Sequence, residues 1–110
     1  MDEEIKVLDP SLGTTLKIAV TANLGTNIHL EDVYFECKFF TGVGNRAPLT
    51  VRKEDMLYVS ADEYIAVVDT SVVGTGEYWL QMTAYVPDDD VVGGIRIEKA
   101  TAPTGIRVKS

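Results

Sequence analysis

The chain has very little cysteine and histidine, the two residue types on which many catalytic and metal-binding sites depend. It contains one cysteine, Cys37, and one histidine, His29, among 110 residues. A single cysteine excludes an intramolecular disulfide and a multi-cysteine zinc site. Any Ser-His-Asp triad or histidine-containing metal site would have to use His29. We therefore expect no catalytic residue, no metal site and no cofactor.

Long apolar runs and basic residues are also scarce. No apolar run approaches the roughly 20 residues of a membrane-spanning helix. Acidic residues outnumber basic ones, 17 to 10, for a net charge of −7, which would repel a nucleic-acid backbone or an anionic membrane. The first residues, Met1-Asp2-Glu3-Glu4, are acidic where a secretory signal would be basic. We expect no nucleic-acid or membrane partner, and a cytoplasmic location during synthesis.

What the chain does have is a globular composition and a strand pattern. Hydrophobic residues make up 45% of it, enough for one domain over residues 1–110 with a core of its own. Apolar side chains recur at every second position, as in Leu16, Ile18 and Val20, which is typical of strands with one buried face. The expected strands are Ile5–Leu8, Thr14–Ala22, Val33–Phe39, Leu49–Arg52, Met56–Val59, Tyr64–Asp69, Tyr78–Val86, Ile95–Lys99 and Ile106–Lys109.

Turn residues separate these strands at short intervals. Glycine, proline and asparagine mark the breaks, among them Gly44-Asn45, Gly93-Gly94, Pro103 and Gly105. A helical turn is expected only at Arg52–Met56. Many short strands with such breaks predict an all-β fold, a two-sheet antiparallel sandwich of about seven or eight strands.

The segment before Tyr78 predicts a particular corner. Immunoglobulin-like sandwiches have a tyrosine near the start of the sixth strand whose hydroxyl bonds back to the preceding backbone. Tyr78 follows Gly74 and Gly76 and shares the expected inner face with Leu80. The immunoglobulin cysteine pair is absent, so the resemblance is to immunoglobulin-like sandwiches in general.

Three further features have ordinary structural interpretations. His29 is expected to be a solvated loop residue, since no second histidine or nucleophile accompanies it. Cys37, between Phe35 and Phe39 on the inner face, is expected to be a small core residue. The Asp88-Asp89-Asp90 cluster could bind calcium, but it lacks the spacing of an EF-hand loop and is also typical of a solvated turn.

The outer face of the Tyr78–Val86 strand is the candidate interaction surface. If Tyr78 points inward, the side chains that point outward are those of Trp79, Gln81, Thr83 and Tyr85. Exposed tryptophan and tyrosine are enriched at protein interfaces and also form carbohydrate-binding platforms. The alternative is that a loop covers this face, or that a β-bulge reverses it.

One series of segments, in a fixed order, covers most of residues 14–108: Leu30–Phe40, Val51–Met56, Tyr64–Thr70, Gly74–Tyr78, Val86–Asp90, Gly94–Arg96 and Thr104–Val108. Taken in order, these segments resemble small immunoglobulin-like sandwich proteins of phages and prophages. They also resemble the amino-terminal domain of phage baseplate upper proteins.

This resemblance implies a non-catalytic virion or tail-assembly module. Its partners would be other virion or tail proteins or copies of itself, as a homo-oligomer, and its final location the virion. The alternative function is a module that binds carbohydrate or another cell-surface ligand through Trp79 and Tyr85. An enzyme is the third hypothesis, and no acid–base pair or activated nucleophile in the sequence favours it.

Overall fold

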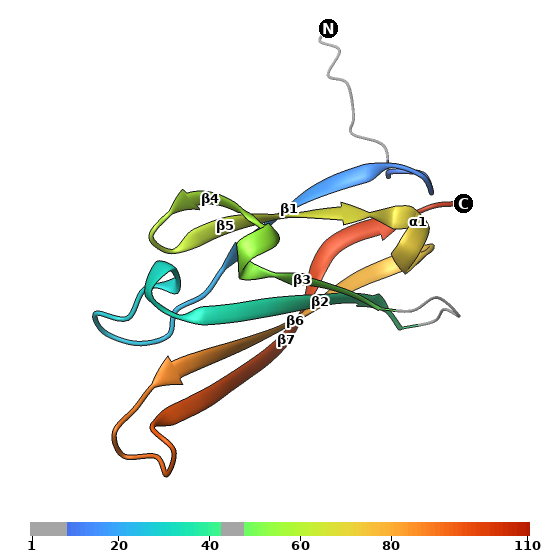
Figure 1. Cartoon of the computed structure of the whole chain (residues 1–110). Coiled ribbons are helices and arrows are strands. Elements are labelled where there is room, and N and C mark those ends of the chain that lie inside the picture. Colours follow the sequence, from blue (N-terminus) through green and yellow to red (C-terminus); the bar gives the residue numbers. More distant parts are fainter. Residues whose placement is uncertain (1–8, 43–47) are drawn as a thin grey trace, which may run out of the picture.

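The structure, a computed structural model, describes residues 9–42 and 48–110. They form seven strands in two antiparallel sheets, which confirms the predicted sandwich (Figure 1). The three-stranded sheet has the order β1-β5-β4, and the four-stranded sheet has the order β3-β2-β6-β7. The strands are β1 (Thr15–Thr21), β2 (Tyr34–Thr41), β3 (Leu49–Arg52), β4 (Leu57–Ser60), β5 (Glu63–Asp69), β6 (Gly76–Pro87) and β7 (Ile95–Val108).

The core lies between the two sheets and follows from the period of two. On β2, Phe35, Cys37 and Phe39 are fully buried, and on β5, Ala66 and Val68 meet them from the opposite sheet. Outward neighbours on the same strands, such as Lys38 and Val67, are exposed. Cys37 is therefore the core residue expected, and burial raises the pKa of its thiol to about 12.

One correction to the sequence-based prediction concerns the end of the chain. The expected strands Ile95–Lys99 and Ile106–Lys109 are one continuous strand, β7. Pro103 and Gly105 mark an irregularity in its pairing with β6, between Glu77 and Trp79, and not a turn. Gly105 has a φ of 83°, which glycine adopts without steric cost, so the strand bulges there and continues.

For the short helices, one expectation is confirmed and two helices are additions to the prediction. The helical turn expected within Arg52–Met56 is a 3-10 helix at Lys53–Asp55. Two further turns were not expected, a 3-10 helix at Leu30–Asp32 and the helix α1 at Thr70–Val73. The prediction missed them because one helical turn is too short to show helical periodicity. The expected strand Ile5–Leu8 and the turn Gly44-Asn45 lie outside the described residues.

Helix α1 makes the crossing between the sheets, from β5 to β6. The Asp69 carboxylate accepts a hydrogen bond from the Ser71 N–H and caps its first turn. At the other end Gly74 has a φ of 100°, a conformation that favours glycine. The buried Thr70 hydroxyl donates to the Thr14 carbonyl, 2.8 Å away, and joins the helix to the start of β1.

Tyr78 closes this corner from the four-stranded sheet. Its side chain is fully buried, and its hydroxyl donates a 2.6 Å hydrogen bond to the Gly74 carbonyl. Burial raises the pKa of the Tyr78 hydroxyl, so it remains a donor at neutral pH. At Gly76 the φ is 118°, and a Cβ would lie 3.5 Å from that of Thr41 on β2. Gly74, Gly76 and Tyr78 thus determine how β6 enters its sheet.

We expect the substitution Tyr78→Phe to destabilise the domain by about 1–3 kcal/mol, because it leaves the buried Gly74 carbonyl without its donor. Urea unfolding followed by circular dichroism measures the change. The control is Tyr34→Phe, at a tyrosine that is 40% exposed, with an expected change within about 0.5 kcal/mol. Equal losses in the two variants would contradict this role of the corner.

Candidate functional site

The four predicted surface residues lie on the outer face of the four-stranded sheet. Tyr78, Met82, Ala84 and Val86 of β6 are buried against the core, so the residues between them point outward. Trp79, Gln81 and Tyr85 are half-buried on that face, whereas Thr83 retains only 8% exposure. The accessible part of this surface therefore comes from Trp79, Gln81 and Tyr85.

Aromatic side chains lie at both ends of this outer face. Tyr85 is paired in register with Tyr34 of β2, and their ring centroids are 5.7 Å apart. Trp79 lies between Phe40 of β2 and Pro103 of β7. Trp79 and Tyr85 are six positions apart on β6, about 20 Å along an extended strand. The face thus presents two separate apolar patches.

The middle of the face is polar. A shallow hollow of about 130 Å³ lies there between the two aromatic ends. Gln81 donates a 3.3 Å hydrogen bond to the Thr101 hydroxyl of β7 at this point. The residues that line the hollow are Glu36, Lys38, Gln81, Thr83, Tyr85 and Lys99. These side chains include positive, negative and neutral hydrogen-bonding groups, and they lie beside the aromatic ring of Tyr85.

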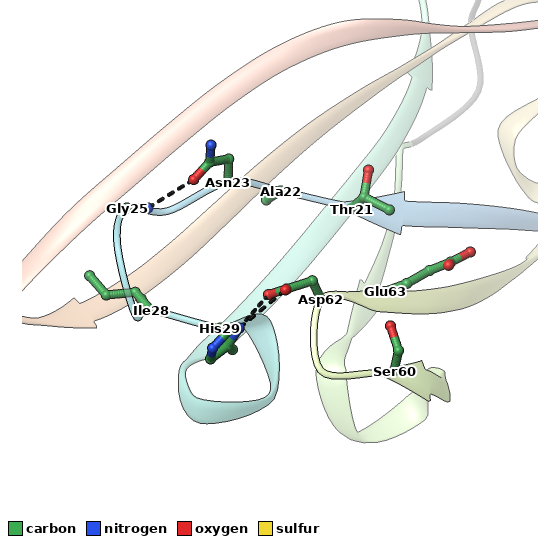
Figure 2. A pocket seen from close by; sticks show the side chains of 9 residues that line it. All are labelled: Thr21, Ala22, Asn23, Gly25, Ile28, His29, Ser60, Asp62 and Glu63. Atoms are coloured by element: carbon green, nitrogen blue, oxygen red, sulfur yellow. Dashed lines mark hydrogen bonds and ion pairs between the residues drawn. The ribbon is translucent and has the colours of Figure 1, made fainter.

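A second candidate site is a cavity of about 650 Å³ at one end of the sandwich (Figure 2). The end of β1 and the following loop form one wall, and the β4–β5 turn forms the other. Across it the imidazole Nδ1 of His29 lies 3.1 Å from both carboxylate oxygens of Asp62. His29 is exposed, as expected, but it has a partner that the sequence did not indicate.

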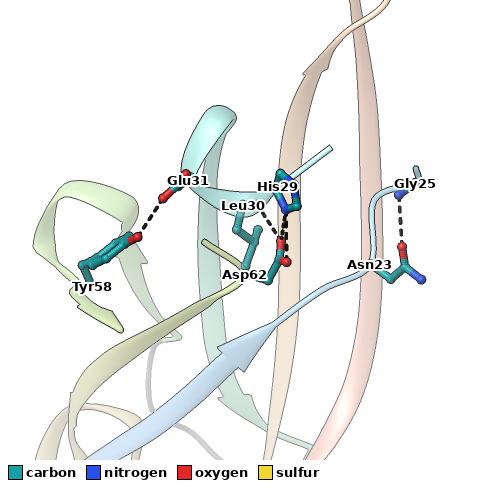
Figure 3. Close-up of polar contacts among 7 residues, drawn as sticks. All are labelled: Asn23, Gly25, His29, Leu30, Glu31, Tyr58 and Asp62. Carbon is teal, nitrogen blue, oxygen red and sulfur yellow. Dashed lines mark hydrogen bonds and ion pairs between the residues drawn. The ribbon is translucent and has the colours of Figure 1, made fainter. Parts of the chain in front are cut away.

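The His29–Asp62 pair belongs to a set of contacts that attach the loop at residues 29–33 to the β4–β5 hairpin (Figure 3). Asp62 also accepts a hydrogen bond from the Leu30 N–H, and Tyr58 donates a 2.8 Å bond to the Glu31 carboxylate. The Lys53 ammonium donates to the carbonyls of Glu31 and Val33, at 2.8 and 2.7 Å. The Leu30 N–H and the carbonyls of Glu31 and Val33 thus have side-chain partners, which is a structural role for these contacts.

The cavity contains the three residue types of a nucleophilic triad, but only two of them are joined by a hydrogen bond. His29 has its carboxylate partner, and Ser60 lines the same cavity. A nucleophile must lie within hydrogen-bond reach of its base, and among the described residues no hydrogen bond joins Ser60 to His29. Cys37 is buried in the core, away from this cavity. Within residues 9–42 and 48–110, the arrangement orients His29 through Asp62 and places no serine or cysteine side chain in hydrogen-bond contact with it.

One aspartate of the cluster after β6 forms an ion pair with an arginine. Asp88 lies 2.7 Å from the Arg96 guanidinium and accepts a hydrogen bond from the Asp90 N–H. The Asp90 N–H and the Arg96 guanidinium lower the pKa of Asp88. In the part of the chain that the structure describes, no group of three or more His, Cys, Asp or Glu side chains is arranged to hold a metal ion.

Comparisons with protein-family models, curated proteins and solved structures found no match to this chain. Among the residues that the structure describes, no helix is long and apolar enough to cross a membrane.

We expect the pKa of His29 to lie above 6.5, because the hydrogen bond to Asp62 and the negative charge of that carboxylate favour the protonated imidazole. A pKa raised in the folded state adds stability that is present below pH 6.5 and is lost as pH rises through the folded pKa. An NMR titration measures it directly, since the chain has one histidine. In Asp62→Asn the pKa should move down toward 6.5; an unchanged pKa would contradict the pairing.

Proposed function

We propose that this chain is a non-catalytic structural module that acts through protein–protein contacts, with the outer face of the four-stranded sheet as its contact surface. The observation that carries the proposal is the placement of Trp79 and Tyr85 on that face, each beside a second apolar ring. Partly exposed aromatic side chains in flat surroundings are typical of interface anchors. These partly exposed rings have area left to bury against a partner.

The finer assignment is an immunoglobulin-like sandwich of phage or prophage origin, which works as a virion or tail component. The resemblance of segments between residues 14 and 108 to such proteins supports it. The strand orders β1-β5-β4 and β3-β2-β6-β7, and the bond from Tyr78 to Gly74, support the immunoglobulin-like part. The partners would be copies of the chain or other virion proteins, and the net charge of −7 disfavours nucleic acid.

Trp79 is the only tryptophan, so its fluorescence reports on this face. We expect its emission to shift to shorter wavelength when a partner covers the face, because the indole then leaves water. The measurement compares dilute protein with concentrated protein, and with protein mixed with the products of genes adjacent to its own.

The matched variants are Trp79→Ser on this face and Tyr58→Ser on β4, where Tyr58 is 60% exposed. Sedimentation velocity should show weaker association for Trp79→Ser and unchanged association for Tyr58→Ser. Equal association of both variants and the parent protein, with no emission shift in any mixture, would overturn the proposal.

The polar hollow on the same face favours a second candidate function, the binding of a carbohydrate. Sugars bind where an aromatic ring adjoins several hydrogen-bonding side chains, and Tyr85 adjoins Gln81 and Lys99 there. Because about 20 Å separates Tyr85 from Trp79, only an oligosaccharide of several units would contact both rings.

A glycan array tests this function. If the face binds carbohydrate, Tyr85→Ala should abolish binding of every ligand found, and Trp79→Ala should weaken binding of long ligands more than of short ones. No bound glycan, or binding that neither substitution affects, would exclude this candidate and leave the protein-contact proposal standing.

A further inference from the structure

Among the residues that the structure describes, most of one edge of strand β7 has no backbone partner. It is the outermost strand of the four-stranded sheet and pairs along its length with β6. On its other side, the described residues provide backbone bonds only beyond its carboxyl end, where Lys109 bonds with Pro10 and Leu12. In Figure 1 the β6–β7 hairpin extends away from the three-stranded sheet.

The hairpin geometry shows which β7 residues direct their backbone groups to the open edge. The Asp88 N–H bonds to the Gly94 carbonyl, and the next pair, Pro87 with Ile95, contains a proline without an N–H. Hydrogen-bonded and non-bonded pairs alternate in an antiparallel ladder. Arg96 and Glu98 therefore bond to β6, whereas Ile95, Ile97 and Lys99 direct their N–H and C=O groups outward.

The same stretch carries unusual side chains for an unpaired edge. Ile95 is 50% exposed and Ile97 is 59% exposed. Between and beside them are charges of opposite sign, Arg96 and Glu98, whose side chains are 2.6 Å apart. Protective edges carry repelling charges or proline, but here the charge pattern is complementary to itself when a second copy runs in the opposite direction.

We propose that two copies of this chain pair antiparallel through β7, with a two-fold axis at Ile97. In this register Ile97 faces Ile97 of the second copy as a hydrogen-bonded pair, and Ile95 faces Lys99. Arg96 of each copy then faces Glu98 of the other as a non-bonded pair, the kind in which side chains approach most closely. All outward backbone groups from Ile95 to Lys99 gain partners.

Other pairing registers of two β7 strands are less favourable. An axis at Arg96, Glu98 or Lys99 places like charges directly opposite each other, which is destabilising. An axis at Ala100 or Thr101 pairs outward backbone groups with Pro103, which has no N–H. An axis at Ile95 moves the pairing into the Gly93-Gly94 turn. The register about Ile97 is the one in which both backbone and charge are satisfied.

The pairing would also extend the proposed contact surface. Ile97 is opposite Tyr85 in register, and Tyr85 contacts Tyr34, so an apolar band would run across the joined sheets of both copies. The β7 dimer rests on the proposed function in one respect, namely that the chain assembles with copies of itself. It uses the strand edge, whereas the proposed contact surface is the outer face at Trp79 and Tyr85.

Charge reversal tests the register. Glu98→Arg retains the Asp88–Arg96 pair within each copy but places a second arginine side chain opposite Arg96 of the other copy. We expect sedimentation equilibrium to show a dimer for the parent protein, and a dissociation constant roughly tenfold or more higher for this variant. The control is Lys17→Glu on β1, a charge reversal at the edge of the other sheet, with an unchanged dissociation constant.

Complementation gives the decisive result. Arg96→Glu alone should show a similar rise in dissociation constant, but an equimolar mixture of Arg96→Glu and Glu98→Arg should form heterodimers, since each acidic position then faces an arginine. The double variant Arg96→Glu/Glu98→Arg should form homodimers again. A mixture that stays monomeric although both variants are folded by circular dichroism would overturn the proposed register.

Cross-linking measures the same register independently. In Ile97→Cys the two Cα atoms would lie about 5.5 Å apart, within disulfide range, so mild oxidation should give a covalent dimer. In Thr101→Cys the two positions would lie about 27 Å apart along the strands and should not cross-link. The native Cys37 is buried and does not interfere. Equal cross-linking of the two variants would contradict the pairing.

Failure of this proposal is distinct from failure of the proposed function. Trp79 pairs with Pro103, at the far end of β7 from Ile97, so edge pairing alone leaves its fluorescence unchanged. A parent protein that is monomeric at every concentration overturns the β7 dimer, while contacts with other proteins at the outer face would still shift the Trp79 emission.

Discussion

The hydrogen bond between the Tyr78 hydroxyl and the Gly74 carbonyl is the interaction on which the rest of this sandwich depends. It lies where the chain passes from one sheet to the other, and it determines the position at which β6 begins. Because β6 pairs with both β2 and β7, its start sets the register of the four-stranded sheet. A shift by one residue would turn Trp79 inward and Tyr78 outward.

The polar groups near this corner support the same crossing. Thr70 is fully buried, yet its hydroxyl both donates to the Thr14 carbonyl and accepts from the Gly13 N–H. A buried hydroxyl without partners would be costly, so its bonds hold α1 in one position against β1. The corner therefore links β1 and β5 of the three-stranded sheet, through α1, to the start of β6 in the four-stranded sheet.

The two surfaces of the molecule differ in what they can do. At the end of the sandwich, His29 and Asp62 fasten a loop to a hairpin, and Tyr58 reinforces that attachment. Lys53 joins the same loop to the 3-10 helix before β4. On the outer face of the four-stranded sheet, Trp79 and Tyr85 remain partly exposed, and a polar hollow lies between them. We therefore assign contacts with other molecules to the outer face of the four-stranded sheet and not to the cavity at the end of the sandwich.

The edge of β7 would restrict how partners are arranged on that surface. A flat face alone would allow many arrangements of partners, whereas a strand edge imposes a register through its backbone hydrogen bonds. The opposite charges of Arg96 and Glu98 restrict the register further. Face and edge lie on the same sheet, so a pairing at the edge would place two copies of the face side by side.

The sequence by itself determined the elements that depend on local alternation and turn chemistry. The buried series Phe35, Cys37 and Phe39, and the outward direction of Trp79 and Tyr85, follow from a period of two along each strand. The glycines before Tyr78 indicated the corner. These features could be predicted because each depends on neighbouring residues only.

Only the tertiary structure decided which distant residues meet. His29 and Asp62 are 33 residues apart, and no local pattern relates them until β1 and β5 pair and bring the two loops together. Pro103 and Gly105 read as a turn in sequence, but pairing with β6 carries the strand through them as a bulge. Long-range pairing overrode local propensity there, because the ladder hydrogen bonds on either side compensate for the interruption.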